Sequence, residues 1–509
     1  MVAQKLHYEL PDNANKMYEN GNYLKAVELY RELYKNHPSN TKYKFRYGVS
    51  MLYAFNYDEA LNILEQACKK TDAPEDKYFH LAKAYHLTNR YEQAINYYKK
   101  YINGGNNDKL KEEAERSIEM CEYAKVLTKN PLKVTFENLG QKINSAGKDY
   151  LPFITPDESF LFFTTRREGT TGRIYDLEGY YTADIYTTKY KYGKWSRVRS
   201  VGYPNSYGNE QTAGISEDGS VMFFYVDNPK DKNNLKQSEF QKTSFRKANK
   251  IDEKFINEKS SKQIAATMSA DKNVLIFASN RSGGKGGFDL YRCKKLPNGK
   301  WGKPQIIKEL STNHDELYPY LTDEGKTLYF SSNGFMTIGG FDLFESHYDE
   351  VNDKWLAPKN LGYPINTPND NFSICFTANK KYAYVADYRK DSYGDLDLYR
   401  VNFEFKEPDY TTVKGFVLKE DSTIFNQRLE IQVFNATTGD LQGVYESKAK
   451  DGSFIMILPP DEYEINISIP EKGRFKQKLI IKGRKDYKKE LNKNITVTFD
   501  AEESEPTLK

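Results

Sequence analysis

Residues 268–291 read MSADKNVLIFASNRSGGKGGFDLY, and this stretch decides how the middle of the chain is interpreted. Its first part is an apolar residue, a serine, a polar turn and an apolar run ending at Phe277, which predicts a β-hairpin. A glycine-rich loop follows, and Asp289-Leu290-Tyr291 then predicts a third strand. The stretch therefore indicates an antiparallel sheet.

The same pattern occurs five times in the middle of the chain. The Ser or Thr of the hairpin recurs at spacings of 61, 53, 53 and 55 residues, and a third strand is predicted in four of the five copies. The three tryptophans, Trp195, Trp301 and Trp355, all follow a third strand at the same phase. A four-stranded unit repeated about every 55 residues is typical of a β-propeller blade.

These repeats resemble the PD40, or TolB-like, propeller repeat, whose blades carry Ser/Asn-Arg followed by Gly-Gly-x-Asp-Leu/Ile-Tyr. The segment Asn138-Leu139-Gly140 with Ile143-Asn144 repeats the segment Asn360-Leu361-Gly362 with Ile365-Asn366. We therefore expect residues 134–139 to supply the missing outer strand of the last blade and close the ring. Five blades are expected, or six if the divergent stretch 227–262 forms strands of its own.

Small residues recur every 34 positions in the first third of the chain. They occupy one phase at Ala14, Gly48 and Ala82 and another at Ala26, Ala60 and Ala94. Small residues at fixed positions let antiparallel helices approach closely, and this pattern resembles the tetratricopeptide repeat (TPR). Residues 107–128 predict one more helix, which caps the array.

A TPR array implies a concave groove that binds a peptide or a partner helix. We expect the first helix of each unit to line it, near Asn15, Val49 and Lys83. The alternative is that the three repeats only dock onto the next domain.

The last hundred residues read as short alternating strands separated by Gly and Asp-Gly turns. Their motif order resembles the carboxypeptidase regulatory-like domain, a transthyretin-like β-sandwich. The whole chain is thus predicted to be a multidomain α + β protein. Its expected parts are helical repeats with a capping helix at 1–130, a β-propeller at 131–406, a β-sandwich at 407–499 and a tail or linker at 500–509.

The charge of the chain argues against a nucleic-acid partner. Its net charge is +4 and its pI about 8.4, whereas nucleic-acid-binding domains usually have a pI above about 9. The stretch 227–262 holds ten Lys or Arg and six Asp or Glu. Two interpretations remain open for it: a solvated insertion, or a surface that binds an acidic partner. For the second, the candidate residues are Lys242, Arg246, Lys247 and Lys250.

Motifs for enzymatic chemistry are missing from the sequence. It contains no Gly-x-Ser-x-Gly, no His-Glu-x-x-His and no phosphate-binding loop, and its four cysteines have no metal-ligand spacing. We therefore expect no enzyme activity, no cofactor and no metal. No apolar run approaches the ~18 residues of a membrane-spanning helix, so no membrane span is predicted.

Helical repeats, then a PD40 propeller, then a regulatory-like sandwich is the domain order of PorE-type periplasmic proteins of Bacteroidota, which this chain resembles. The resemblance implies a non-catalytic periplasmic scaffold whose signal peptide has been removed. Its expected partners are proteins of the type IX secretion machinery or the outer membrane. Peptidoglycan is a partner only if an OmpA-like domain follows Lys509. The alternative is a propeller that senses a glycan or a peptide in its central pore.

Overall fold

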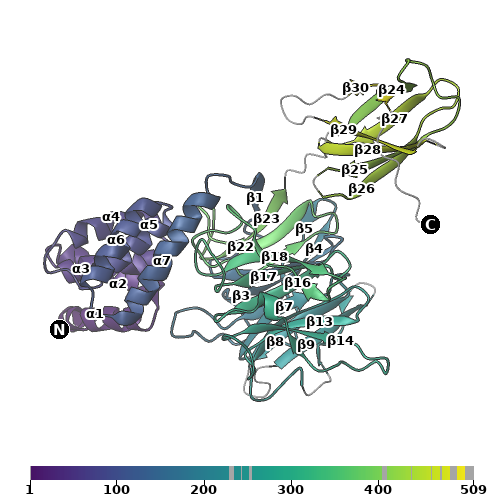
Figure 1. The fold of residues 1–509 in the computed structure, drawn as a ribbon. Helices are drawn as coiled ribbons and strands as arrows, with labels where there is room; N and C mark the ends of the chain where they lie inside the picture. Colours follow the sequence, from purple (N-terminus) through teal and green to yellow (C-terminus); the bar gives the residue numbers. More distant parts are fainter. Residues whose placement is uncertain are drawn as a thin grey trace. The chain divides into compact units, whose positions relative to one another are not determined.

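The computed structural model describes residues 2–227, 234–241, 244–251, 255–403, 410–436, 438–459, 461–469, 473–481 and 490–498. The chain divides into two units, Met1–Glu404 and Phe405–Lys509. Seven helices and five antiparallel sheets make up the described part of the first unit, and two sheets make up that of the second (Figure 1). Among the described residues, no helix is long and apolar enough to cross a membrane.

Each of the seven helices packs against the next one along the chain. Gly48 shows why small residues recur at this phase: a Cβ added there would lie 2.9 Å from Leu64 Cγ. Asn22, Asn40 and Asn107 begin three of the helices, where their side-chain oxygens accept a backbone N–H. The helices are α1 (Val2–Glu19), α2 (Tyr23–Asn36), α3 (Thr41–Tyr53), α4 (Tyr57–Cys68), α5 (Lys77–Leu87), α6 (Tyr91–Gly104) and α7 (Asp108–Leu127).

The predicted hairpins and third strands form the first two sheets after the helices. Within the described residues, the divergent stretch 227–262 contributes strands β9, β10 and β11 to the second sheet. The first sheet contains β2 (Asp149–Ile154), β3 (Phe160–Thr165), β4 (Asp184–Lys191), β5 (Lys194–Trp195) and β6 (Arg199–Ser200). The second contains β7 (Asn209–Ile215), β8 (Val221–Asp227), β9 (Asn234–Gln241), β10 (Ser244–Phe245) and β11 (Asn249–Lys250).

The next three sheets follow the same antiparallel order from first strand to last. The third contains β12 (Gln263–Met268), β13 (Val274–Ser279), β14 (Asp289–Lys294) and β15 (Gln305–Ile306). The fourth contains β16 (Glu316–Thr322), β17 (Thr327–Ser332), β18 (Asp342–Asp349), β19 (Lys354–Trp355) and β20 (Lys359–Asn360). The fifth contains β1 (Val134–Asn138), β21 (Ile374–Phe376), β22 (Tyr382–Asp387) and β23 (Asp397–Phe403).

The first strands of the five sheets contact one another in a ring, which is a propeller-like arrangement. Hydrogen bonds link each of these strands to the next. The donors and acceptors are Thr212 Oγ1 to Leu151 O (2.7 Å), Thr267 Oγ1 to Ile215 O (2.9 Å), Leu321 N to Thr267 Oγ1 (3.2 Å), Tyr320 OH to Phe376 O (3.2 Å) and Cys375 Sγ to Ile154 O (3.4 Å).

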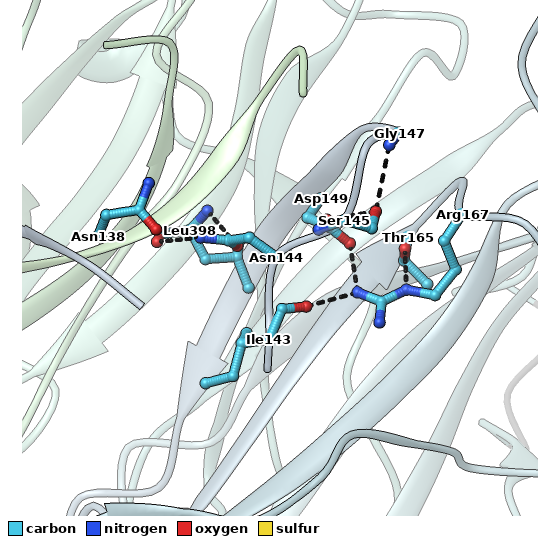
Figure 2. Close-up of polar contacts among 9 residues, drawn as sticks. All are labelled: Asn138, Ile143, Asn144, Ser145, Gly147, Asp149, Thr165, Arg167 and Leu398. Atoms are coloured by element: carbon cyan, nitrogen blue, oxygen red, sulfur yellow. Dashed lines mark hydrogen bonds and ion pairs between the residues drawn. The ribbon is translucent and has the colours of Figure 1, made fainter. Parts of the chain in front are cut away.

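Strand β1 completes the fifth sheet, as the sequence predicts. It pairs antiparallel with β23, with Val134 opposite Phe403 and Asn138 opposite Tyr399. The amide of Asn144 holds the same strand: Leu398 N donates to its Oδ1 (2.9 Å), and its Nδ2 donates to Leu398 O (3.1 Å), as Figure 2 shows. We call this pair of bonds to one residue the asparagine clamp.

The asparagine clamp recurs in three of the other sheets. In each, an asparagine in the loop that leaves the sheet binds both backbone groups of the second residue of the third strand. The equivalents of Asn144 on Leu398 are Asn205 on Ile185, Asn257 on Leu235 and Asn366 on Leu343. The segment that contains β1 and Asn144 is therefore held to the fifth sheet by the same pair of hydrogen bonds that the loops of three other sheets form.

The helical array is packed against the loops of the sheets. Tyr57 OH donates to Asn369 Oδ1 (2.5 Å), and His86 Nε2 lies 2.8 Å from Ile338 O. Ile338 itself is fully buried within the hydrophobic core of the helices. Tyr57 is the first residue of α4 and His86 lies near the end of α5, so the ends of helices contact the sheet loops, and helices and sheets share one unit.

The second unit has a separate hydrophobic core between its two sheets. One sheet contains β24 (Thr411–Lys419), β27 (Ser453–Leu458), β30 (Glu490–Asn492) and β31 (Ile495–Val497). The other contains β25 (Glu430–Asn435), β26 (Leu441–Glu446), β28 (Glu462–Ile469) and β29 (Gly473–Ile480).

Candidate partner-binding surfaces

A basic side chain lies among tyrosines between the first and second helix pairs. The Arg46 guanidinium, from α3, is 4.9 Å from the ring of Tyr18 and donates to Tyr30 OH (3.0 Å) and to Asn15 Oδ1. Tyr30 OH also donates to Asn15 Oδ1 (2.7 Å). Within the described residues Arg46 forms no ion pair, and its hydrogen-bond partners Tyr30 and Asn15 are neutral.

Lys83, on α5, repeats this arrangement one helix pair further along. Its Nζ lies 5.2 Å from the ring of Tyr53 and 3.4 Å from a carboxylate oxygen of Glu113 on α7. Burial favours a lower pKa for Lys83, but Tyr53 and Glu113 outweigh it and the pKa is raised. Lys83 therefore remains protonated. We call Asn15, Arg46, Lys83 and Glu113 the polar row.

The three residues predicted for the helical surface do not all lie on one surface. Asn15 and Lys83 belong to the polar row, whereas Val49 is fully buried in the core of the helices. Its position three residues after Arg46 turns it towards the neighbouring helices. Arg46 was missed by the sequence analysis, although Asp12, Arg46 and His80 share a 34-residue phase that signals it.

The basic residues predicted in the second sheet lie at its outer strands. Arg246, Lys247 and Lys250 are exposed, and Lys242 lies outside the described residues. The Nζ atoms of Lys236 and Lys247 lie 4.8 and 4.9 Å from the centre of the Tyr203 ring. Tyr203 belongs to the loop that connects the first sheet to the second. These residues are spread along the outer edge of the sheet and do not converge on one pocket.

A cleft of about 540 Å³ lies where the helices meet the sheets, and the sequence analysis did not anticipate it. Phe55 and Tyr57, from the turn between α3 and α4, stand 5.0 and 5.5 Å from the ring of Tyr388. Arg389 lines the same cleft and pairs with the buried carboxylate of Asp387 (2.8 Å). Burial raises the pKa of Asp387 to about 6, although Arg389 opposes this shift.

The residues that define the propeller repeat have structural partners. Asp289, Asp342 and Asp397 each accept a backbone N–H from the loop before the third strand (2.8 Å in each case), and Asp184 does the same. Arg281 lies 4.8 and 5.0 Å from the rings of Phe277 and Tyr291 and donates to Phe255 O. These residues therefore hold the loops that precede the third strands.

Comparison with known proteins supports the helical repeat directly. A tetratricopeptide repeat model matches residues 78–103, which span α5 and α6. No curated protein matches the chain.

Solved structures with similarity to the chain have low sequence identity and low TM-scores. The α-L-arabinofuranosidase of Lactobacillus brevis is 12% identical over 56% of this chain and 94% of its own, at a TM-score of 0.34. An endo-arabinase of Bacteroides thetaiotaomicron is 12% identical over 52% and 98%, at 0.31. The WD40 repeats of RRP9 are 10% identical over 53% and 97%, at 0.29. At these TM-scores the likeness carries no argument about activity.

One expectation from the sequence is nevertheless corrected. We expected no enzyme activity because the familiar motifs are missing, but the similar structures include glycoside hydrolases and a prolyl endopeptidase. Catalysis by two carboxylates needs only that they face each other in space, so it leaves no local sequence motif. Missing motifs are therefore not a reason to exclude an enzyme.

Proposed function

We propose that the protein is a protein-interaction scaffold of the bacterial periplasm, in which the helical repeats bind a partner and a five-bladed propeller supports them. A transthyretin-like sandwich forms the second unit in this proposal. The association with the type IX secretion machinery or the outer membrane rests on the resemblance of the domain order, and the matched tetratricopeptide repeat supports partner binding.

The observation that carries the proposal is the polar row. Arg46 and Lys83 come from successive helix pairs, and each rests against a tyrosine ring. Arg46 has only neutral hydrogen-bond partners among the described residues, so its charge is available to an acidic or carbonyl group of a partner. The array contacts the sheets through hydrogen bonds of Tyr57, His86 and Arg116, and none of these bonds involves Asn15, Arg46 or Lys83.

The test is affinity capture from envelope extracts with the full chain as bait. We expect the wild-type chain to recover secretion-machinery or outer-membrane proteins, and the variant Arg46→Glu/Lys83→Glu to lose them. The control is Arg31→Glu/Lys35→Glu, which makes the same charge change on α2. If both variants retain the same proteins, the polar row is not the binding surface.

The cellular location has its own test. We expect a tagged chain with its native leader to fractionate with the periplasm or outer membrane and to be degraded when protease is admitted to the periplasm. Recovery in the cytoplasmic fraction would contradict the periplasmic part of the proposal while leaving partner binding open to measurement.

A further inference from the structure

Five basic side chains gather around Trp195 on the outer edge of the first sheet. They line a cavity of about 420 Å³ in which the described lining residues include no acidic one. We call this surface the basic groove; its lining residues are Thr187, Thr188, Lys189, Lys191, Lys194, Trp195, Ser196, Arg197 and Arg199. It belongs to the first unit and shares no residue with the polar row.

Strand pairing places two of these lysines directly opposite each other. Tyr190 faces Trp195, and Lys191 faces Lys194 in the antiparallel pair of β4 and β5. Like charges at directly opposite positions destabilise a sheet. Both lysines are exposed, and neither forms an ion pair within the described part of the chain. An anion bound between them would relieve this repulsion.

In the fourth sheet, β18 and β19 pair in a similar way across a longer turn, and the residues next to the aromatic pair carry opposite charges. Tyr348 faces Trp355 there, and their ring centroids are 5.2 Å apart, against 4.8 Å for Tyr190 and Trp195. At the next position Asp349 faces Lys354, an oppositely charged pair. The fold therefore accepts an acidic residue at this position, and the Lys191–Lys194 pair is not a requirement of the strand geometry.

Neighbouring residues extend the charge without neutralising it. Arg197 and Arg199 are exposed and have no acidic partner among the described residues. In the fourth sheet, by contrast, Asp353 lies 3.4 and 3.2 Å from the side-chain nitrogens of Arg292 and Lys294 of the third sheet. The edge of the fourth sheet is thus internally neutralised, whereas Lys191, Lys194, Arg197 and Arg199 of the first sheet have no ion-pair partner among the described residues.

The spacing of the cations fits an extended acidic chain. Lys189 and Lys191 are alternate residues of β4, so they point to one face of the strand about 6.6–6.8 Å apart. Carboxylates at every second position of an extended peptide have the same spacing. Strands β5 and β6 are the outermost of their sheet, where an added strand can align. Trp195 also lines the groove and offers an apolar contact to the side chains between the carboxylates.

We propose that the basic groove binds an extended acidic segment of a partner protein, with alternate carboxylates against Lys191, Lys194, Arg197 and Arg199. This second docking surface is independent of the polar row, and its test does not require the partner proposed for the helices. A scaffold with both surfaces holds two proteins at once.

The experiment measures fluorescence anisotropy of a short labelled peptide of alternating Glu and Val added to the full chain. We expect the acidic peptide to bind, its Gln/Val counterpart not to bind, and the affinity to fall steeply with added salt because exposed charges are screened. Equal binding of the two peptides would overturn the proposal. So would binding only of inorganic polyphosphate or of anionic phospholipid vesicles.

Two matched variants locate the binding on the first sheet. Lys194→Ala and Lys354→Ala remove the same charge from equivalent positions of two sheets. We expect about a tenfold loss of peptide affinity for Lys194→Ala and no loss for Lys354→Ala, since an exposed charge-assisted contact is lost only in the first. Equal losses would show a nonspecific effect of net charge and overturn the assignment.

A charge reversal tests the lysine pair without risking the fold. Lys191→Asp places opposite charges at this pair of positions, so we expect it to abolish peptide binding while the melting temperature stays the same or rises. Binding that survives this variant would contradict the proposed role of the pair.

Discussion

Single arginine side chains hold the propeller loops in place. Arg167, Arg281 and Arg389 each lie over aromatic rings of their own sheet and donate to a backbone carbonyl of another loop. Arg167 also pairs with Asp149 at 2.7 Å, and that carboxylate is fully buried. The Ser/Asn-Arg signature of the repeat thus has a physical cause, the satisfaction of loop carbonyls and of a buried charge.

Arg167→Ala tests this role. The substitution leaves the Asp149 carboxylate buried without its cation, a change that costs about 3–5 kcal/mol. Urea denaturation should show this loss, and the double variant Arg167→Ala/Asp149→Asn should recover part of it. The exposed Arg173 provides a control whose alanine variant should shift the midpoint little. A loss of the same size in that control would contradict the buried-pair explanation.

Glu316 predicts a dependence of stability on pH. It is fully buried, and burial raises its pKa to about 7 although Thr312 and Ser332 donate hydrogen bonds to it. Between about pH 4.5 and 7 the unfolded chain ionises this group while the folded chain keeps its proton. Its contribution to the free energy of unfolding should therefore fall across this window, by on the order of 3 kcal/mol, and stay constant above it.

The measurement compares wild type with Glu316→Gln. Because glutamine does not titrate, the difference in unfolding free energy between the two chains should change between pH 4.5 and 7 in favour of the variant. A difference that stays flat over this range would show that the Glu316 carboxyl has an ordinary pKa in the folded protein.

The same hydrogen bonds between a loop asparagine and a third strand recur from sheet to sheet. Among the described residues the asparagine clamp occurs four times, and of these four only the clamp of Asn144 connects the beginning of the sheet region to its end. Asn144 also donates to Asn138 on β1, as Asn366 donates to Asn360 in the fourth sheet (2.8 Å in both). Ring closure therefore depends on a side chain as well as on the β1–β23 pairing.

Asn144→Ala should loosen the closing strand. It leaves the buried N–H of Leu398 without its partner, a loss of about 1–3 kcal/mol, while the Leu398 carbonyl still accepts the N–H of Leu139 (3.1 Å). Hydrogen exchange of β1 and β23 should become faster than in wild type. Asn366→Ala, the matched variant, should accelerate exchange in β18 and leave β1 unchanged. Faster exchange of β1 in both variants would indicate a general loss of stability instead.

Helices and strands can be predicted from the sequence where their residue pattern recurs along the chain. The 34-residue spacing of small residues places α1–α6, and the repetition of Asn138–Asn144 at Asn360–Asn366 correctly pairs β1 with the last strand. It does not place Val49, because helical phase alone cannot tell a surface position from one covered by a neighbouring helix. The cleft lined by Phe55, Tyr57 and Tyr388 was also missed, since its residues are far apart in the chain and carry no common motif.

Two units with separate cores make up the chain as a whole. Helices and sheets are joined by contacts such as Tyr57 with Asn369 and His86 with Ile338, whereas the second unit buries its own cluster of apolar side chains. Cooperativity of unfolding follows from shared buried contacts, so the helices should melt together with the five sheets.

Differential scanning calorimetry should accordingly show two transitions. Tyr57→Ala, which removes a contact between helices and sheets, should lower the melting temperature of the transition assigned to Met1–Glu404 by a few degrees and leave the other in place. Three resolved transitions, with the helices melting separately, would contradict the packing of helices and sheets as one cooperative body.

The pairing of β1 with β23 also constrains how the protein is made. During synthesis β1 leaves the ribosome before any of the five sheets exist, and its partner β23 emerges only after the strands of the other four sheets. Until then the nascent ring has two open strand edges, which are sites of aggregation and of chaperone recognition. A chain truncated anywhere before β23 can never close, so proteolytic quality control can distinguish incomplete copies by their persistent open edge.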